Sequence, residues 1–155
     1  MTNEECTAFM TRLNRLVQEI DTVRKGRGLH RLQTVADRAR MRLVATGEGN
    51  ITVSDLRAVV DQQLADGTWR YGLLYDFIGA TAAVTATEMR ALAAHIEALP
   101  SPKRGPVAVV TEHPALFGMA RMYSMLTEAA GLRFQVFRDR PSAEHWLDEQ
   151  QLIHG

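Results

Sequence analysis

The segment that decides the fold is Tyr71–Phe77, YGLLYDF, followed by the loop IGATAAVTAT at positions 78–87. A short apolar run bounded by turn residues is typical of a strand that is covered on both faces. Asp76 and a loop that contains threonines lie at the carboxyl end of this run, where open α/β sheets bind their ligands. The segment therefore predicts a buried central strand that feeds a helix, with a ligand site at its end.

Helix and strand patterns alternate downstream of this segment. Thr85 and Glu88 have the spacing of a capping box, and the helix that they open is ended by Pro100. Strands that alternate with helices form parallel pairs joined by crossovers, so this half of the chain predicts a mostly parallel sheet. The later elements that we expect are a loop at 101–106 with Lys103 and Arg104, a strand at Val107–Val110, a helix at Pro114–Ala130, a strand at Arg133–Arg138 and a final helix capped by Ser142.

Two shorter strands precede the central one. Apolar residues alternate in part over Leu29–Asp37 and Met41–Glu48, with a polar turn at Arg38–Arg40 between them. Thr52 and Asp55 form a second capping-box pattern, which opens a helix before the central strand. The upstream half therefore predicts an antiparallel hairpin at one edge of the sheet.

The amino-terminal segment carries a helical stripe between Asn3 and Arg24. Its apolar residues recur at alternating steps of three and four: Cys6, Phe9, Leu13, Leu16, Ile20 and Val23. Such a stripe must be covered, either by the body of the same domain or by the equivalent helix of a second chain. We therefore expect an amphipathic helix at 1–28, added to an α/β domain at 29–155.

The composition is typical of a globular protein with one domain. Of 155 residues, 46% are apolar and 23% are charged. The 18 basic and 18 acidic side chains cancel, so no overall field attracts nucleic acid. The sequence has no signal-peptide pattern, no apolar run of the about 20 residues that span a bilayer, and a single cysteine, Cys6. We expect a cytoplasmic protein that neither binds nucleic acid nor integrates into a membrane.

Polar residues gather at the expected carboxyl ends of the strands, where side chains converge in α/β folds. Asp76 and His113 have the chemistry of an acid–base pair, since histidine titrates near neutral pH and a carboxylate can orient it. The alternative is that Glu112 and His113 enter a helix and Asp76 caps a turn. The ligand-site candidates are Asp76, Thr81, Thr85, Glu112, His113 and Asp139.

The sequence offers no motif for a metal or a cofactor. Its five histidines lack the spacing of metal ligands, and one cysteine adds nothing to them. It also contains neither a GxGxxG fingerprint nor a Walker loop. We therefore expect no cofactor and no metal.

The helix expected at 114–130 is apolar on two sides. One stripe suits the sheet: Leu116, Met119, Tyr123, Leu126 and Ala130. The second stripe consists of Gly118, Met122, Met125 and Ala129. A helix that is apolar on two sides is covered on two sides. Either the amino-terminal helix lies on the second stripe, or this stripe forms a dimer or partner interface together with Phe9, Leu13, Leu16 and Ile20.

Four stretches carry a resemblance to a known family: GNITVSDL at 49–56, YGLLYDF at 71–77, GPVAVVTEHPALFGMARMYSML at 105–126 and FQVFRDRPSAEHWL at 134–147. From about Leu29 to Leu147 the chain resembles the STAS-like fold of bacterial anti-sigma-factor antagonists, in particular the SpoIIAA-like branch grouped with STAS/SEC14 domain proteins. The resemblance implies an α/β domain with a mixed, mostly parallel sheet, an antiparallel edge hairpin and covering helices, to which the first helix is an addition.

The loop after the central strand departs from the family pattern. In the antagonists this loop ends in an aspartate–serine pair whose serine is phosphorylated, whereas Thr81, Thr85 and Thr87 stand in the loop here. The resemblance therefore does not carry the phosphorylation switch over to this chain. A phosphothreonine at a helix amino terminus is electrostatically acceptable, but a plain helix cap is the simpler role for Thr85.

These observations predict a non-catalytic regulatory or protein-interaction module that forms a homodimer. The first alternative is a carrier for a small apolar ligand or a lipid, which the SEC14 relatives suggest, and the second is an enzyme that uses Asp76 and His113. An interaction module predicts an exposed apolar stripe around Met122. A carrier predicts a closed apolar pocket beneath the helices, and an enzyme predicts Asp76 and His113 within hydrogen-bond reach.

Overall fold

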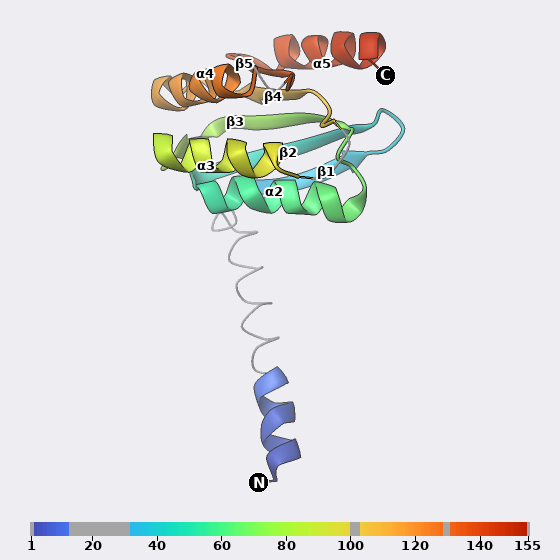
Figure 1. Cartoon of the computed structure of the whole chain (residues 1–155), viewed down its shortest axis with the longest axis vertical. Helices are drawn as coiled ribbons and strands as arrows, with labels where there is room; N and C mark the ends of the chain where they lie inside the picture. The colour runs from blue at the N-terminus through green and yellow to red at the C-terminus, as the bar shows by residue number, and fades with distance from the viewer. Residues whose placement is uncertain (1, 13–31, 100–102, 129–130, 155) are drawn as a thin grey trace.

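In the computed structural model, the described residues are 2–12, 32–99, 103–128 and 131–154. They contain a five-stranded sheet in which the strands follow each other in chain order from one edge to the other (Figure 1). The first pair is antiparallel and the other three pairs are parallel, as the sequence predicts. The strands are β1 (Leu32–Asp37), β2 (Arg42–Ile51), β3 (Gly72–Ala82), β4 (Val107–Val110) and β5 (Phe134–Phe137).

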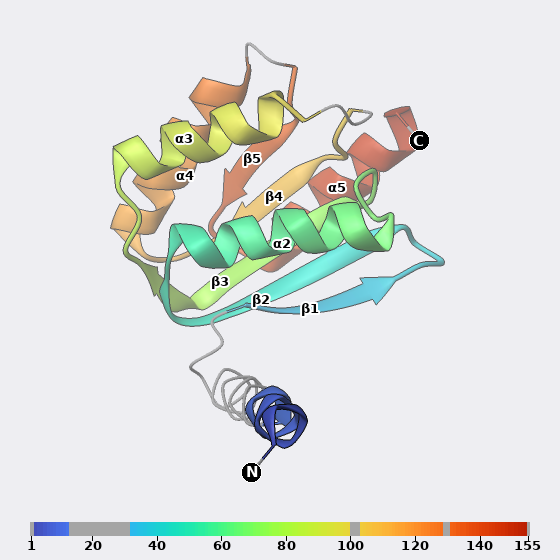
Figure 2. The ribbon, with the colours of Figure 1, turned by 60° about the horizontal axis from the view of Figure 1, so that its bottom comes forward.

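Helices cover both faces of the sheet. Three of them, α2 (Val53–Asp66), α3 (Ala86–Glu97) and α4 (Pro114–Glu128), lie on one face, and α5 (Arg140–His154) lies on the other (Figure 2). The central strand β3 accordingly alternates between two buried cores. Its residues Leu73, Tyr75 and Phe77 contribute to the core beneath α2–α4, while Leu74 packs with Leu147 of α5. The continuous apolar run of YGLLYDF is explained by this double cover.

Both predicted capping boxes are confirmed. The Thr52 and Thr85 side chains accept hydrogen bonds from the backbone N–H groups of Asp55 and Glu88, whose carboxylates accept in return from the cap N–H groups. These reciprocal bonds satisfy backbone donors that the first turn of a helix otherwise leaves free. They fix where α2 and α3 begin.

Three predicted boundaries are wrong. The strand β2 runs on to Ile51 instead of ending at Glu48. The strand β3 runs on to Ala82 instead of ending at Phe77, because parallel pairing with β2 resumes after a register shift between Thr46 and Glu48. The last helix begins at Arg140, since the carboxylate of Asp139 accepts a 2.8 Å hydrogen bond from the N–H of Ser142. Asp139, and not Ser142, therefore caps α5.

The amino-terminal segment is described only in part. Residues 3–12 are helical, as predicted, and every one of them is exposed, with exposed fractions of 55% for Phe9 and 49% for Met10. The described part of this stripe is thus not covered by the sheet domain. Leu13, Leu16 and Ile20 lie outside the described residues, and the division into segments 1–28 and 29–155 remains a prediction.

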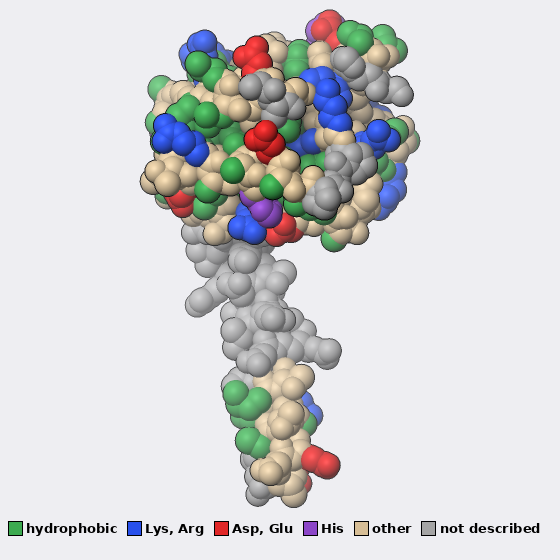
Figure 3. Space-filling view, viewed as in Figure 1, with side chains coloured by type: hydrophobic (Ala, Val, Ile, Leu, Met, Phe, Trp, Pro, Cys, Tyr) green, Lys and Arg blue, Asp and Glu red, His purple; other side chains and the backbone are tan. Residues whose placement is uncertain are grey.

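The surface is mixed in charge. On the face seen in Figure 3, basic and acidic side chains are interspersed with hydrophobic ones over the body of the domain. This agrees with the formal net charge of zero. Within the described ranges, the helices fall short of the length and apolarity that crossing a membrane requires.

Candidate functional site

Asp76 lies within β3 and is held by a neighbouring helix. Its carboxylate forms an ion pair with Arg140 of α5 (Nη1–Oδ2, 3.3 Å) and accepts a hydrogen bond from the N–H of Ile78. Arg140 is also bonded to Glu144 one turn along the helix, at 3.2 Å. Asp76 thus helps to fasten the start of α5 to the sheet and does not stand free at a strand end.

The remaining strand-end candidates are exposed and serve mostly as local caps. Thr81 donates from its hydroxyl to Asn50 on β2, and Thr85 caps α3. His113 accepts a 3.4 Å hydrogen bond from the N–H of Leu116 and so closes the first turn of α4, while the side chain of Glu112 beside it is exposed. Two hydrogen bonds from Ser142 hold the pKa of Asp139 below its usual value.

Asp76 and His113, the proposed acid–base pair, do not form a pair in the structure. Asp76 is engaged with Arg140 and Ile78, and the Nδ1 atom of His113 faces the backbone of its own helix. No hydrogen bond links the two residues within the described part of the chain. Nor do the described ranges contain a group of three or more histidine, cysteine, aspartate or glutamate residues that is placed to hold a metal ion.

The second stripe of α4 is only partly free. Gly118 and Met125 are exposed, Met125 to 71%, but Met122 is half-buried and packs into the core that α3 covers. The sequence predicts that either the amino-terminal helix or a partner chain covers Met122. Instead, α3 lies alongside α4 and shields this side chain. Ala129 lies outside the described residues.

A groove beside α4 was not apparent from the sequence. It has a volume of about 540 Å³ and runs between α4, the edge strand β5 and α5. Its walls combine an exposed methionine, aromatic side chains and two arginines: Arg121, Met125, Arg133, Phe134 and Trp146. The side chains of β5 alternate between the two faces of the sheet: Phe134 and Val136 pack on the α2–α4 side and Phe137 packs on the α5 side.

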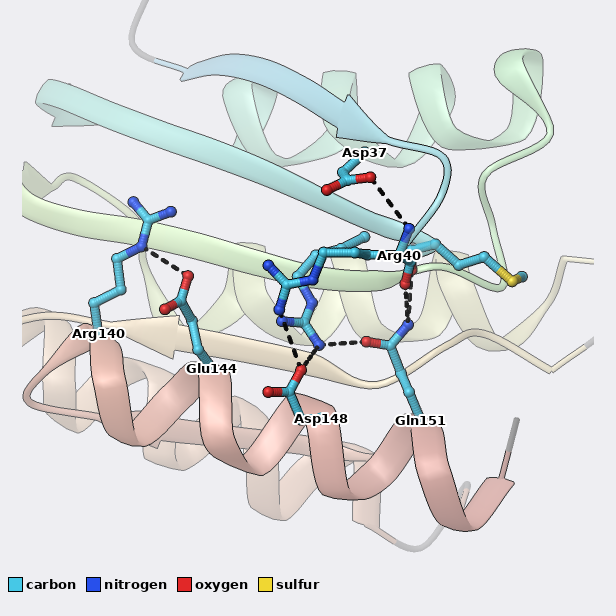
Figure 4. Close-up of polar contacts among 8 residues, drawn as sticks. Asp37, Arg40, Arg140, Glu144, Asp148 and Gln151 are labelled. Atoms are coloured by element: carbon cyan, nitrogen blue, oxygen red, sulfur yellow. Dashed lines mark hydrogen bonds and ion pairs between the residues drawn. The ribbon is translucent and has the colours of Figure 1, made fainter.

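A polar cluster under α5, which we call the α5 clamp, consists of Arg40, Arg42, Asp148 and Gln151 (Figure 4). Arg42 is 97% buried, with an exposed fraction of 3%, and its Nη2 donates to the carboxylate of Asp148 at 2.8 Å and to the side-chain oxygen of Gln151. The Gln151 amide donates in turn to the carbonyl oxygens of Arg40 and Met41. The hydrogen bond from Arg42 lowers the pKa of Asp148.

An apolar cavity lies beneath α2, α3 and α4. Its volume is about 50 Å³, and its walls are side chains of the core, among them Leu92, Ile96 and Leu116. One cation lines this otherwise apolar space, Arg104, with an exposed fraction of 5%. The sequence placed Arg104 in a surface loop, so its burial is a correction.

Local backbone packing explains why Arg104 is buried. The next residue, Gly105, donates from its N–H to the carbonyl of Trp69 at 3.0 Å. A Cβ atom at position 105 would overlap the backbone oxygens of Arg70 and Tyr71, so only glycine permits this approach. The guanidinium carbon of Arg104 then lies 4.8 Å from the centroid of the Trp69 ring. A glycine placed directly before a buried strand is the one signal in the sequence that points to this contact.

Comparison with solved structures identifies the fold. An anti-sigma factor antagonist from Mycobacterium paratuberculosis has a TM-score of 0.50 and 18% identity, over 76% of this chain and 94% of that chain. An uncharacterized protein with a SpoIIAA-like fold from Shewanella loihica PV-4 has a TM-score of 0.49 and 16% identity, over 75% and 91% of the two chains. No protein-family model and no curated protein matches the chain.

The chain therefore has a STAS-like, SpoIIAA-like α/β fold, as its sequence predicts. At such low identity the likeness extends to the fold and not to the residues of a site. Function has to be argued from the groove, the cavity and the side chains that line them.

Proposed function

We propose that this chain is a non-catalytic regulatory module of the cytoplasm that acts by binding a protein, and that a second copy of the chain is one such partner. The groove between α4 and β5 carries this proposal. It brings the exposed Met125 together with Phe134 and Trp146, and two arginines flank them. Methionine, aromatic residues and arginine are the types enriched in protein interfaces.

The position of the groove supports the same function. The strand β5 is an edge strand, so its outer backbone groups have no neighbour within the described sheet. A partner segment that lies in the groove gains apolar contacts from α4 and backbone hydrogen bonds from β5. A protein that shares the fold, from Mycobacterium paratuberculosis, is an anti-sigma factor antagonist, which is consistent with a role in binding a protein partner.

The test is the oligomeric state of the Met125→Glu variant. We expect the wild-type chain to dimerise, and Met125→Glu to raise the dimer dissociation constant at least about tenfold, because a charge enters the apolar part of the interface. Light scattering coupled to size-exclusion chromatography measures the mass across a dilution series. The matched control is Leu152→Glu, the same kind of change at a residue that is 88% exposed and does not line the groove. A monomeric wild type, or an equal effect of both variants, contradicts the dimer.

A second candidate function is favoured by the cavity. A carrier requires an apolar space shielded from water, and the cavity beneath the helices, at about 50 Å³, has room for a ligand of only a few heavy atoms. Native mass spectrometry of the freshly purified protein tests it: a discrete added mass on the folded chain supports a carrier, and its absence across several preparations speaks against it.

A further inference from the structure

Arg104 is a buried cation whose charge is not neutralised by the described residues. Its Nη2 donates to the side-chain oxygen of Gln63 at 2.9 Å, and its Nε has no hydrogen-bond partner. None of the ion pairs among the described residues includes Arg104. A buried ion whose partners are all neutral is strongly destabilising unless a counter-charge reaches it. Binding of an anion beside Arg104 is therefore energetically favourable.

A second unpaired polar atom lies on the same cavity. The hydroxyl of Tyr123 is buried and has no hydrogen-bond partner, and both Tyr123 and Arg104 line the cavity. Burial raises the pKa of Tyr123 to about 12, although the charge of Arg104 opposes the rise. Tyr123 is therefore protonated at neutral pH, and its O–H is a free donor.

The size of the cavity limits what it can hold. Its volume is about 50 Å³. A buried water occupies roughly 10–15 Å³ by the same kind of measure, so there is room for about four water-sized groups. The walls are apolar, with Leu92 from α3 and Leu116 from α4 among them. A short aliphatic body fits such walls, and a single anionic end fits Arg104 and Tyr123.

We propose that the cavity binds a short-chain monocarboxylate of about two or three carbon atoms. Its carboxylate accepts hydrogen bonds from the Nε–H of Arg104 and the O–H of Tyr123, and its aliphatic part packs against Leu92 and Leu116. This inference rests on the second candidate function, because it names the ligand class that a carrier with this cavity takes. The two free donors match one carboxylate, whereas the larger and more highly charged phosphate requires more donors than these.

The experiment compares propionate with its neutral analogue propionamide by isothermal titration calorimetry of the full chain. The two probes have nearly the same shape and differ in charge. We expect propionate to bind at least about tenfold more tightly, because hydrogen bonds to an ionised acceptor are about twice as strong as neutral ones.

Two variants locate the binding. Arg104→Met removes the cation and keeps an apolar side chain of similar length, and Ala120→Val fills part of the cavity while leaving Arg104 in place. Each is expected to weaken propionate binding at least about tenfold. If Arg104→Met does not fold, Ala120→Val still decides the question. Circular dichroism confirms that a variant is folded.

The outcomes separate the inference from the carrier function. If propionamide binds as tightly as propionate and Ala120→Val abolishes both, the cavity is a ligand site but the carboxylate anchor is wrong. If neither probe binds in the millimolar range, both the anchor and the carrier function are wrong for ligands of this size. If propionate binds equally to the wild type and to both variants, it binds elsewhere and the inference is overturned.

Discussion

The described part of the domain buries two arginines almost completely, and they are treated in opposite ways. Arg42, under α5, lies 2.8 Å from the carboxylate of Asp148, and Gln151 accepts a further bond from it. Arg104, beneath α2–α4, has a neutral acceptor in Gln63 and an aromatic ring in Trp69. The exposed fractions, 3% and 5%, are nearly equal, so the difference lies in the counter-charge and not in the burial.

This difference indicates a structural role for Arg42 and a ligand-binding role for Arg104. A buried arginine with its own carboxylate is a fastener, and the α5 clamp holds the last helix against β2. A buried arginine that receives no carboxylate from the described residues has a charge that a ligand can use. An unpaired buried charge destabilises a fold, and such charges cluster at functional sites. Arg104 is therefore the residue of this domain to test first for a function.

The largest effect on stability is expected from Asp148→Ala. The change leaves Arg42 buried without its carboxylate, and we expect it to lower the free energy of unfolding by about 3 kcal/mol, at the low end for a broken buried pair because Asp148 itself is half exposed. Urea denaturation measures the change. A loss below about 0.5 kcal/mol, as for a surface pair, would show that the α5 clamp is not a buried fastener.

A smaller effect is expected from Gln63→Leu. Gln63 is completely buried, accepts from Arg104 and donates to the carbonyl of Thr68 at 3.2 Å. Losing both bonds removes the Gln63 acceptor of Arg104, so we expect about 2 kcal/mol of destabilisation. Comparing the thermal unfolding of Gln63→Leu with that of the double variant Gln63→Leu/Arg104→Met tests whether the unsatisfied charge of Arg104 causes the loss. If removing the arginine does not restore stability, the unsatisfied charge is not the cause.

Arg104→Met by itself is expected to leave the free energy of unfolding unchanged or to raise it in the absence of ligand. Methionine fills much of the same space without a charge to desolvate, and such replacements are often neutral or stabilising. The matched change Arg42→Met removes a paired cation and is expected to destabilise more. Equal losses of stability for the two variants in urea denaturation would contradict the claim that the two arginines differ in their counter-charge.

The smallest effect concerns acid pH. The pKa of Asp148 is lowered in the folded protein, first by its hydrogen bond from Arg42. A carboxyl group whose folded pKa is depressed stabilises the fold above its unfolded pKa of about 3.9, and this contribution is lost as the pH falls through the folded value. We expect Asp148→Asn to be less stable than wild type at pH 7, with the difference shrinking towards pH 3. A difference that is constant with pH contradicts this role of the charge.

The sequence was sufficient for the architecture because its signals are local. The capping boxes at Thr52 and Thr85, the apolar run of Val107–Val110 and the alternation in β5 each fix an element without knowledge of its neighbours. The boundary error at Phe77 arose where a strand distant in sequence decides, whereas the error at Ser142 arose between two neighbouring cap candidates, Asp139 and Ser142. Pairing with β2 extends β3, and the Asp139 carboxylate caps α5 three residues before Ser142.

The candidate site was harder to predict because it depends on contacts between distant segments. Strand-end residues such as His113 and Asp139 were singled out by type and position, yet the structure uses both as caps. Arg104 looked like a loop residue, and only the close approach of Gly105 to the backbone of Arg70 and Tyr71 buries it. A contact between two backbone segments that are distant in sequence cannot be predicted from hydrophobic periodicity or from composition.

The most direct measurement is the nuclear magnetic resonance signal of the arginine Nε–H groups during a titration with propionate. The Arg104 signal is assigned from its loss in Arg104→Lys, and the Arg42 signal from its loss in Arg42→Lys. We predict that the Arg104 signal shifts in a saturable way, while the Arg42 signal stays in place, because the guanidinium of Arg42 already has a counter-charge in Asp148 through its Nη2. A titration that leaves Arg104 unmoved, or that moves both signals alike, would contradict the claim that Arg104 awaits an anionic ligand.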